Sequence, residues 1–115
     1  MKKKLFTIWQ DSKLYTEKGQ AAFGEVFPGL NKNDFPQPKS IDLLLEVFST
    51  CTSHNDIILD SFAGSGTTAH AVLNLNKQDG GNRKFILIEM ENYAETITAE
   101  RVKRVMNGYA DTEGT

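Results

Sequence analysis

A carboxylate, a glycine loop and a run of hydroxyl side chains follow one another in "DSFAGSGTT", residues 60–68. Glycine-rich loops between a strand and a helix usually bind phosphates, because backbone N–H groups gather at the positive end of the helix. Asp60 lies four residues before the first glycine, and its negative charge would repel a phosphate. The motif therefore favours a ligand that carries positive charge.

Two nucleotide-binding motifs share part of this pattern. The segment "GSGTTA" formally satisfies the dinucleotide fingerprint G-x-G-x-x-G/A, and Glu89 lies about where the ribose-binding acid of such a fold is expected. A dinucleotide needs room for a pyrophosphate beside the loop, whereas S-adenosylmethionine brings a sulfonium and an ammonium with one carboxylate. Asp60 therefore favours S-adenosylmethionine over NAD. A P-loop is excluded, because no lysine follows the glycines at the required spacing.

The loop needs a strand before it and a helix after it. The segments "DIILD" (56–60) and "RKFILIE" (83–89) are continuous apolar runs, which indicates parallel strands buried on both faces. Between them the pattern predicts one helix from about Thr67 to Lys77 and a turn at residues 79–82. The stretch therefore predicts a right-handed βαβ unit within an α/β fold.

Helices are predicted on both sides of this unit. Residues 15–27 place apolar side chains at helical spacing, and Ser40 can cap a second helix. The second helix has two apolar faces, which predicts burial on two sides. These faces consist of Ile41, Leu44, Leu45 and Phe48 on one side and of Leu43 and Val47 on the other.

A last helix is predicted after the second strand. Asn92 and Glu95 resemble a capping box, and Ile97 and Val105 belong to the apolar side of the helix that they open. Arg101 falls in the final turns, where a cation suits the helix dipole. We expect an N-terminal arm and loop at 1–37, the cofactor-binding unit at 38–108 and a tail at 109–115, because all three prolines fall within 28–38.

Composition limits the function. A chain of 115 residues forms one small domain. Its net charge of −2 argues against nucleic-acid binding by this chain alone. The single cysteine, Cys51, allows no internal disulfide and no metal cluster built on a cysteine pair, and we expect it to be buried. The two histidines lack partners at ligand spacing, so no metal site is expected. No apolar run is long enough for a signal peptide or a membrane span, which makes the cytoplasm the default.

Taken together, these residues resemble the adenine-N6 and cytosine-N4 DNA methyltransferases, whose cofactor loop reads close to D-x-F-x-G-S-G-T-T. The flanks "IWQDSKLYTEKG", "FPQPKS" and "ENYAETITAERV" resemble the C-terminal part of the modification subunit of type III restriction-modification systems. The resemblance extends from about Ile8 to Gly108. It implies a partial Rossmann-like methyltransferase fold with parallel strands and flanking helices, and S-adenosylmethionine as the cofactor.

The resemblance also implies roles for the loop residues. Asp60 would lie beside the methionine moiety of the cofactor, and Phe62 would pack along the cofactor. Gly64 and Gly66 would let the backbone approach the cofactor without a Cβ clash. Ser65 and Thr67 would line the loop with hydroxyl groups.

Two further cofactor contacts are implied outside the loop. Glu89, at the end of the second strand, would accept hydrogen bonds from both ribose hydroxyls. Lys39 would help to hold the methionine end, although the family usually continues with a second proline where this chain has Ser40.

One feature of the family is absent from the sequence. These enzymes flip the target base out of the duplex and hold it with a [DNS]-P-P-[YFW] tetrapeptide. Pro28, Pro36 and Pro38 are never adjacent, so no catalytic residue is assigned. We expect the S-adenosylmethionine-binding C-terminal part of a site-specific DNA adenine-N6 methyltransferase, without its catalytic motif and target-recognition region, and inactive alone.

The resemblance implies several partners for such a part. They are the remaining catalytic half, DNA within the complete enzyme, and a restriction subunit. Self-association through uncovered sheet edges is also expected. A membrane is not expected as a partner. A non-catalytic cofactor-binding or assembly module that works with a partner chain is the alternative, and a NAD-dependent oxidoreductase fragment is a further one.

Overall fold

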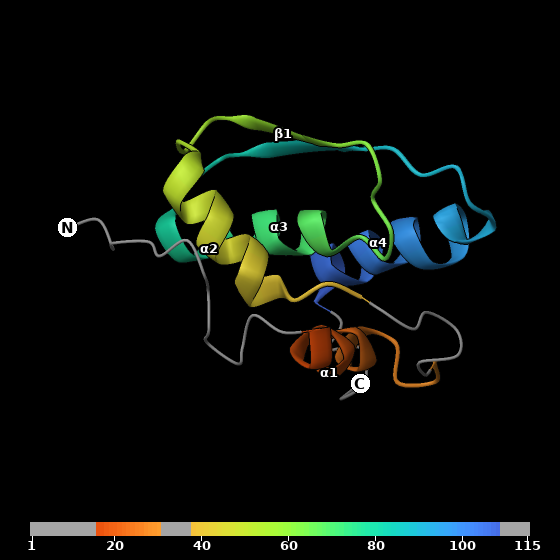
Figure 1. Ribbon diagram of the computed structural model, residues 1–115. Coiled ribbons are helices and arrows are strands. Elements are labelled where there is room, and N and C mark those ends of the chain that lie inside the picture. The colour runs from red at the N-terminus through yellow and green to blue at the C-terminus, as the bar shows by residue number, and fades with distance from the viewer. Residues whose placement is uncertain (1–15, 31–37, 109–115) are drawn as a thin grey trace.

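The computed structural model describes residues 16–30 and 38–108, and the predictions for the remaining residues lie outside this part (Figure 1). Its elements are α1 (Thr16–Val26), α2 (Ile41–Cys51), β1 (Ile57–Asp60), α3 (Thr67–Asp79), β2 (Lys84–Leu87), the 3₁₀ turn η2 (Asn92–Ala94), the π-helical segment η3 (Glu95–Ala99) and α4 (Glu100–Asn107). The chain is therefore mixed α/β, as the sequence predicts.

The two strands form a small parallel sheet. Ile57 pairs with Lys84 and Asp60 with Leu87, while α3 connects the end of β1 to the start of β2. The pairing continues beyond the strands, since the Ile88 N–H donates to the Asp60 carbonyl over 3.0 Å. The predicted order of strand, glycine loop, helix and parallel strand is confirmed, and α3 ends two residues later than expected.

The helices lie on one side of this sheet (Figure 1). Ile58, Phe85 and Leu87 point toward them and are half-buried. The opposite face is apolar and open, with exposed fractions of 64% for Ile57, 61% for Leu59, 53% for Ile86 and 47% for Ile88. The prediction of strands buried on both faces is therefore wrong for the described residues. The apolar runs suit two covered faces, but the described helices cover only one.

Helix α2 begins at the predicted cap, because the Leu43 N–H donates to the Ser40 hydroxyl over 3.3 Å. The helix packs against α3, yet none of its residues is fully buried. The predicted burial on two sides is wrong for this reason: α2 has a close neighbour mainly on one side. Cys51, at its end, is exposed instead of buried.

Fully buried apolar side chains lie along α3, at Ala69, Ala71, Val72 and Leu75, and in a cluster where α1 meets the C-terminal helix, which is the continuous run of η2, η3 and α4. Phe23, Val26 and Phe27 pack there against Ile97, and Phe23 and Phe27 have ring centroids 5.0 Å apart. Helical spacing therefore identified the buried side of α1 correctly. None of the helices in residues 16–30 and 38–108 combines the length and apolar composition needed to cross a bilayer.

The last helix starts differently from the prediction. Glu91, not Asn92, precedes its first turn, and no side-chain cap is present at η2 or η3. The capping-box prediction is thus wrong, because the turn closes through the Ala94 N–H and the Glu91 carbonyl. Arg101 lies in the first turn of α4 and is fully buried, so its predicted place in the final turns is a second correction; Arg104 is the basic residue of the last turn.

Candidate functional site

The glycine loop borders a pocket of about 210 Å³ at the end of β1. Its lining consists of Lys39, Leu44, Asp60, Phe62, Ala63, Gly64, Ser65, Thr67 and Thr68. Most of the residues predicted from the sequence therefore meet around one cavity. Gly66 and Glu89 do not line it; Gly66 is buried behind the loop, and Glu89 bonds to the loop backbone.

Asp60 is held by two hydrogen bonds within the protein. Its Oδ1 accepts from the Phe62 N–H over 3.1 Å, and its Oδ2 accepts from the Thr68 hydroxyl over 2.6 Å. The carboxylate thus joins the end of β1 to the first turn of α3. An ionised carboxylate has about four acceptor positions, so these bonds leave capacity for a cationic ligand.

The loop backbone depends on glycine at two positions. Gly64 has φ = 57° and Gly66, the N-cap of α3, has φ = 89°. A Cβ added to Gly66 would lie 3.1 Å from the Thr98 carbonyl oxygen of η3. The structure therefore explains this glycine by the close approach of η3 and by the left-handed conformation. Its predicted role toward a ligand stays a prediction.

Ser65 and Thr67 are bound from the protein side. Both hydroxyl oxygens accept from Nη1 of Arg101, over 2.7 Å and 3.1 Å, and they lie 3.1 Å from each other. The Nε–H of Arg101 donates to Nδ1 of His70 over 3.2 Å. Burial, with the neighbouring guanidinium, lowers the pKa of His70 to about 3, so this imidazole is neutral at pH 7.

Sequence reasoning missed Arg101 as a residue of this region. Its spacing placed it among the cations of a final helical turn, and its contacts lie 31 to 36 positions earlier in the chain. No local signal identifies such a residue, because the pattern of α4 does not show which loop it faces.

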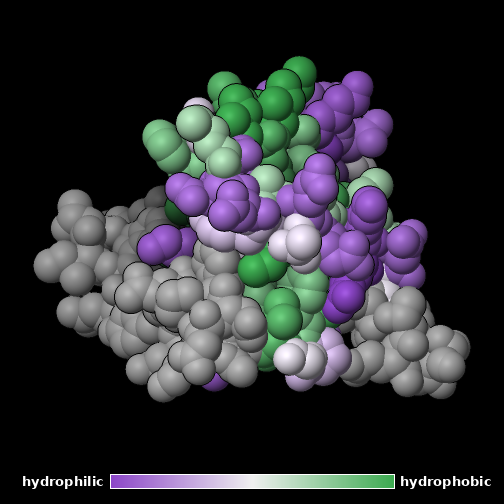
Figure 2. All heavy atoms as spheres, turned by 90° about the vertical axis from the view of Figure 1, so that its right-hand side faces the viewer, coloured by the Kyte–Doolittle hydropathy of each residue, from purple (hydrophilic) through white to green (hydrophobic). Residues whose placement is uncertain are grey.

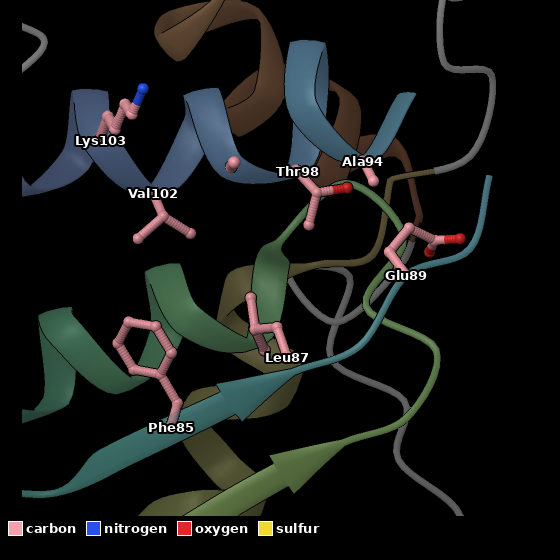
Figure 3. A pocket seen from close by; sticks show the side chains of 8 residues that line it. Phe85, Leu87, Glu89, Ala94, Thr98, Val102 and Lys103 are labelled. Atoms are coloured by element: carbon pink, nitrogen blue, oxygen red, sulfur yellow. The ribbon is translucent and has the colours of Figure 1, made fainter. Parts of the chain in front are cut away.

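Glu89 holds two backbone N–H groups. Its Oε1 accepts from Gly64 over 2.7 Å and its Oε2 from Glu91 over 3.1 Å. Glu89 also borders a second pocket of about 400 Å³ between β2 and the C-terminal helix. In Figure 3, Phe85 and Leu87 point from β2 toward Val102, while Glu89 lies at the opposite end of the pocket.

Phe62 and Lys39 lie at the mouth of the first pocket. The Phe62 side chain is 89% exposed although its backbone is anchored by Asp60, and Lys39 is exposed as well. An ordinary core position is therefore excluded for Phe62. The pocket combines one carboxylate, one lysine, an exposed aromatic ring and glycine backbone. Such a set fits a ligand with an ammonium, a carboxylate and an apolar body.

The fold and this loop define a class of protein, and comparison with known families identifies it. Residues 1–100 match the N6_N4_Mtase family, described as DNA methylase. The chain belongs to this family of N6/N4 DNA methylases, which confirms the resemblance seen in the sequence.

Individual relatives place the chain more narrowly. It is 41% identical over 86 residues to the type II methyltransferase M.KpnI of Klebsiella pneumoniae, covering 75% of this chain and 20% of the relative. It is 37% identical over 95 residues to the StyLTI Mod subunit of Salmonella typhimurium strain LT2, a type III restriction-modification enzyme, covering 70% and 15%. The EcoPI Mod subunit of Escherichia phage P1 is 33% identical over 108 residues, covering 94% and 15%. The match thus spans a fifth or less of each relative.

Proposed function

We propose that this chain is the S-adenosylmethionine-binding part of a site-specific DNA adenine-N6 methyltransferase of the type III restriction-modification kind. The observation that carries the proposal is the pocket in which Asp60 and Lys39 meet the glycine loop. Membership in the DNA methylase family gives the reaction class. The bound cofactor supplies the methyl group, and the complete enzyme transfers it to an exocyclic amine of DNA in the cytoplasm.

The charges around the pocket support this ligand. Asp60 suits the ammonium and sulfonium of the methionine moiety, and Lys39 suits its carboxylate. Phe62 offers an exposed ring to the apolar part of the cofactor, and Glu89 keeps acceptor positions for the ribose hydroxyls. NAD fits less well, because its pyrophosphate would lie near the Asp60 carboxylate.

A partner region supplies what this chain lacks. The sequence has no two adjacent prolines, so the base-holding motif must come from elsewhere. The apolar outer face of the sheet offers a surface for the catalytic half, which would also bring the DNA contacts and, through the complete enzyme, a restriction subunit. The alternative is a non-catalytic module that binds cofactor and assembles with a partner chain.

Calorimetric titration with S-adenosylmethionine and with NAD tests the cofactor. We expect measurable binding of S-adenosylmethionine and weaker or absent binding of NAD. Asp60→Asn keeps acceptor and donor groups for Phe62 and Thr68 but removes the charge, and we expect it to cost roughly 1.5 to 3 kcal/mol of binding free energy.

The matched control is Thr68→Val, which removes the hydroxyl that Asp60 holds and leaves the carboxylate charged. It should lower the free energy of unfolding while changing cofactor affinity less than Asp60→Asn does. Equal affinities of wild type and Asp60→Asn would show that the carboxylate does not bind the cofactor. Preferential binding of NAD would favour the oxidoreductase alternative.

A further inference from the structure

Among the described residues, Arg101 has the largest fully buried side chain. It comes from α4, and its guanidinium lies against the inner side of the glycine loop. Burying a guanidinium is costly unless its N–H groups are well bonded. Here three of those bonds go to Ser65, Thr67 and His70, which belong to the loop and to the first turn of the helix that follows it.

The surrounding contacts reinforce this arrangement. One turn before Arg101, the Thr98 hydroxyl donates to the Gly64 carbonyl over 2.5 Å. The Arg101 side chain also lies within 3.8 Å of the position that a Cβ on Gly66 would take. The C-terminal helix therefore bonds to Gly64 through Thr98 and to Ser65 and Thr67 through Arg101, and it lies close to Gly66 between them.

We propose that Arg101 is a positioning residue for the glycine loop. Its planar guanidinium donates in fixed directions, so one side chain can set the hydroxyl of Ser65 and the hydroxyl of Thr67 relative to His70. Ser65 and Thr67 themselves form part of the wall of the pocket. Arg101 thereby holds this wall in the binding conformation before a ligand arrives, without touching the ligand. The identity of that ligand rests on the proposed function, but the positioning does not.

Hydrogen exchange of backbone amides, followed by NMR without cofactor, is the direct test. Arg101→Lys keeps the charge but cannot reproduce the planar set of bonds. We expect the amides of Gly64 and Gly66, bonded to Glu89 and to the Ala63 carbonyl, to exchange at least tenfold faster. Amides in α2 should keep their rates, which separates a local effect from general destabilisation; α1 is left out of this comparison, because the Arg101 guanidinium lies 5.9 Å from the Phe23 ring centroid.

Arg104→Lys is the control on the same helix. Arg104 bonds to Glu100 and to the Val26 carbonyl and lies 4.7 Å from the Phe27 ring centroid, away from the loop. This variant should leave the loop amides unchanged. Loop exchange that is the same in wild type and Arg101→Lys would overturn the proposal.

A second pair of variants tests the positioning role of Arg101 if Arg101→Lys does not fold. Thr67→Val keeps the side-chain volume and removes an acceptor of the guanidinium, whereas Thr67→Ser keeps the acceptor. Thr67→Val should speed exchange at Gly64 and Gly66, and Thr67→Ser should restore rates close to wild type. Equal exchange in both variants would contradict the role of the bond.

A binding measurement keeps this inference distinct from the proposed function. With S-adenosylhomocysteine as the probe, affinity should fall about tenfold in Arg101→Lys and remain unchanged in Arg104→Lys. If the wild-type chain does not bind this probe, the proposed cofactor is wrong, while the exchange rates still decide whether Arg101 positions the loop. Binding that is equally tight in wild type and Arg101→Lys would overturn the positioning role.

Discussion

The acidic residues of the site make hydrogen bonds within the protein in addition to any contact with a ligand. Asp60 fixes the turn after β1, and Glu89 fixes Gly64 and the turn at Glu91. Alanine at either position would therefore loosen the loop in addition to removing a charge. Substitutions that keep hydrogen-bonding atoms, such as Asp60→Asn, are needed to separate these two effects.

His70 gives the protein a defined response to acid. Its pKa is about 3 in the folded protein, because burial and the nearby Arg101 disfavour the charged form, against 6.5 for an ordinary histidine. Between those values the unfolded chain binds the proton and the folded chain does not, so acid favours unfolding. The contribution of His70 to the free energy of unfolding should be fully present above about pH 6.5. Below that pH the free energy of unfolding should fall by up to ~1.4 kcal/mol per pH unit.

Chemical denaturation of wild type and His70→Asn, measured between pH 4 and 7.5, checks this response. The Asn side-chain oxygen can accept from Arg101 in place of Nδ1 but does not titrate. The variant should show a shallower loss of stability in acid, with the carboxylates contributing the remainder. Parallel curves for the two proteins would rule out His70 as the titrating group.

At the scale of the elements, the junction between the loop and α3 is set by Gly66. Alanine there would have to adopt φ near 89° and lie 3.1 Å from the Thr98 carbonyl oxygen. We expect Gly66→Ala to lower the free energy of unfolding by more than ~1 kcal/mol, since both the strain and the contact oppose it.

Gly24→Ala provides a matched comparison within α1. A Cβ at this position meets no atom within 4 Å, and alanine favours a helix by roughly 0.5 to 1 kcal/mol over glycine. Urea unfolding should therefore show opposite signs for the two substitutions. A stabilised Gly66→Ala variant would mean that η3 does not press on the loop.

At the scale of the whole molecule, the open face of the sheet predicts association. Ile57, Leu59, Ile86 and Ile88 form this outer sheet face, and Figure 2 shows apolar atoms gathered at the top of the molecule, where the sheet lies. Large exposed apolar patches usually mark an interface. We expect the isolated chain to form dimers or larger species in sedimentation velocity, with the fraction rising with concentration.

A paired substitution tests which surface is responsible. Leu59 and Ile86 lie opposite each other in the sheet, and Leu59→Thr with Ile86→Thr makes the outer sheet face more polar while placing β-branched side chains, which suit strands, at both positions. This variant should be more monomeric than wild type. Met106→Thr, on the exposed side of α4, should not change the distribution; if it does, the association uses another surface.

Catalytic activity also depends on the whole molecule. Without a base-holding motif, the chain alone should not methylate DNA, because the positioning that such groups supply can contribute ~7 to 11 kcal/mol to catalysis. Incubation with tritiated S-adenosylmethionine and mixed-sequence DNA measures this directly. Adding a polypeptide that carries the catalytic half should produce labelled DNA, and Leu59→Thr with Ile86→Thr should weaken that rescue. Label in DNA without a partner would contradict the proposal.

The sequence by itself determined the local features of this protein. The order of strand, loop, helix and strand, the cap at Ser40, the buried side of α1 and the family of the chain all follow from its residues. These features depend on glycine dihedrals, on caps and on apolar periodicity, which act over a few neighbouring positions.

Only the tertiary structure decided which faces are covered and which distant groups meet. Covering one face of the sheet leaves Leu59 exposed, although its apolar run indicates burial. The bond from Gly64 to Glu89 joins residues 25 positions apart, and the bond from Arg101 to Ser65 joins residues 36 apart. Such contacts depend on how the helices pack against the sheet. Burial of apolar surface stabilises that packing regardless of how far apart the residues lie along the chain.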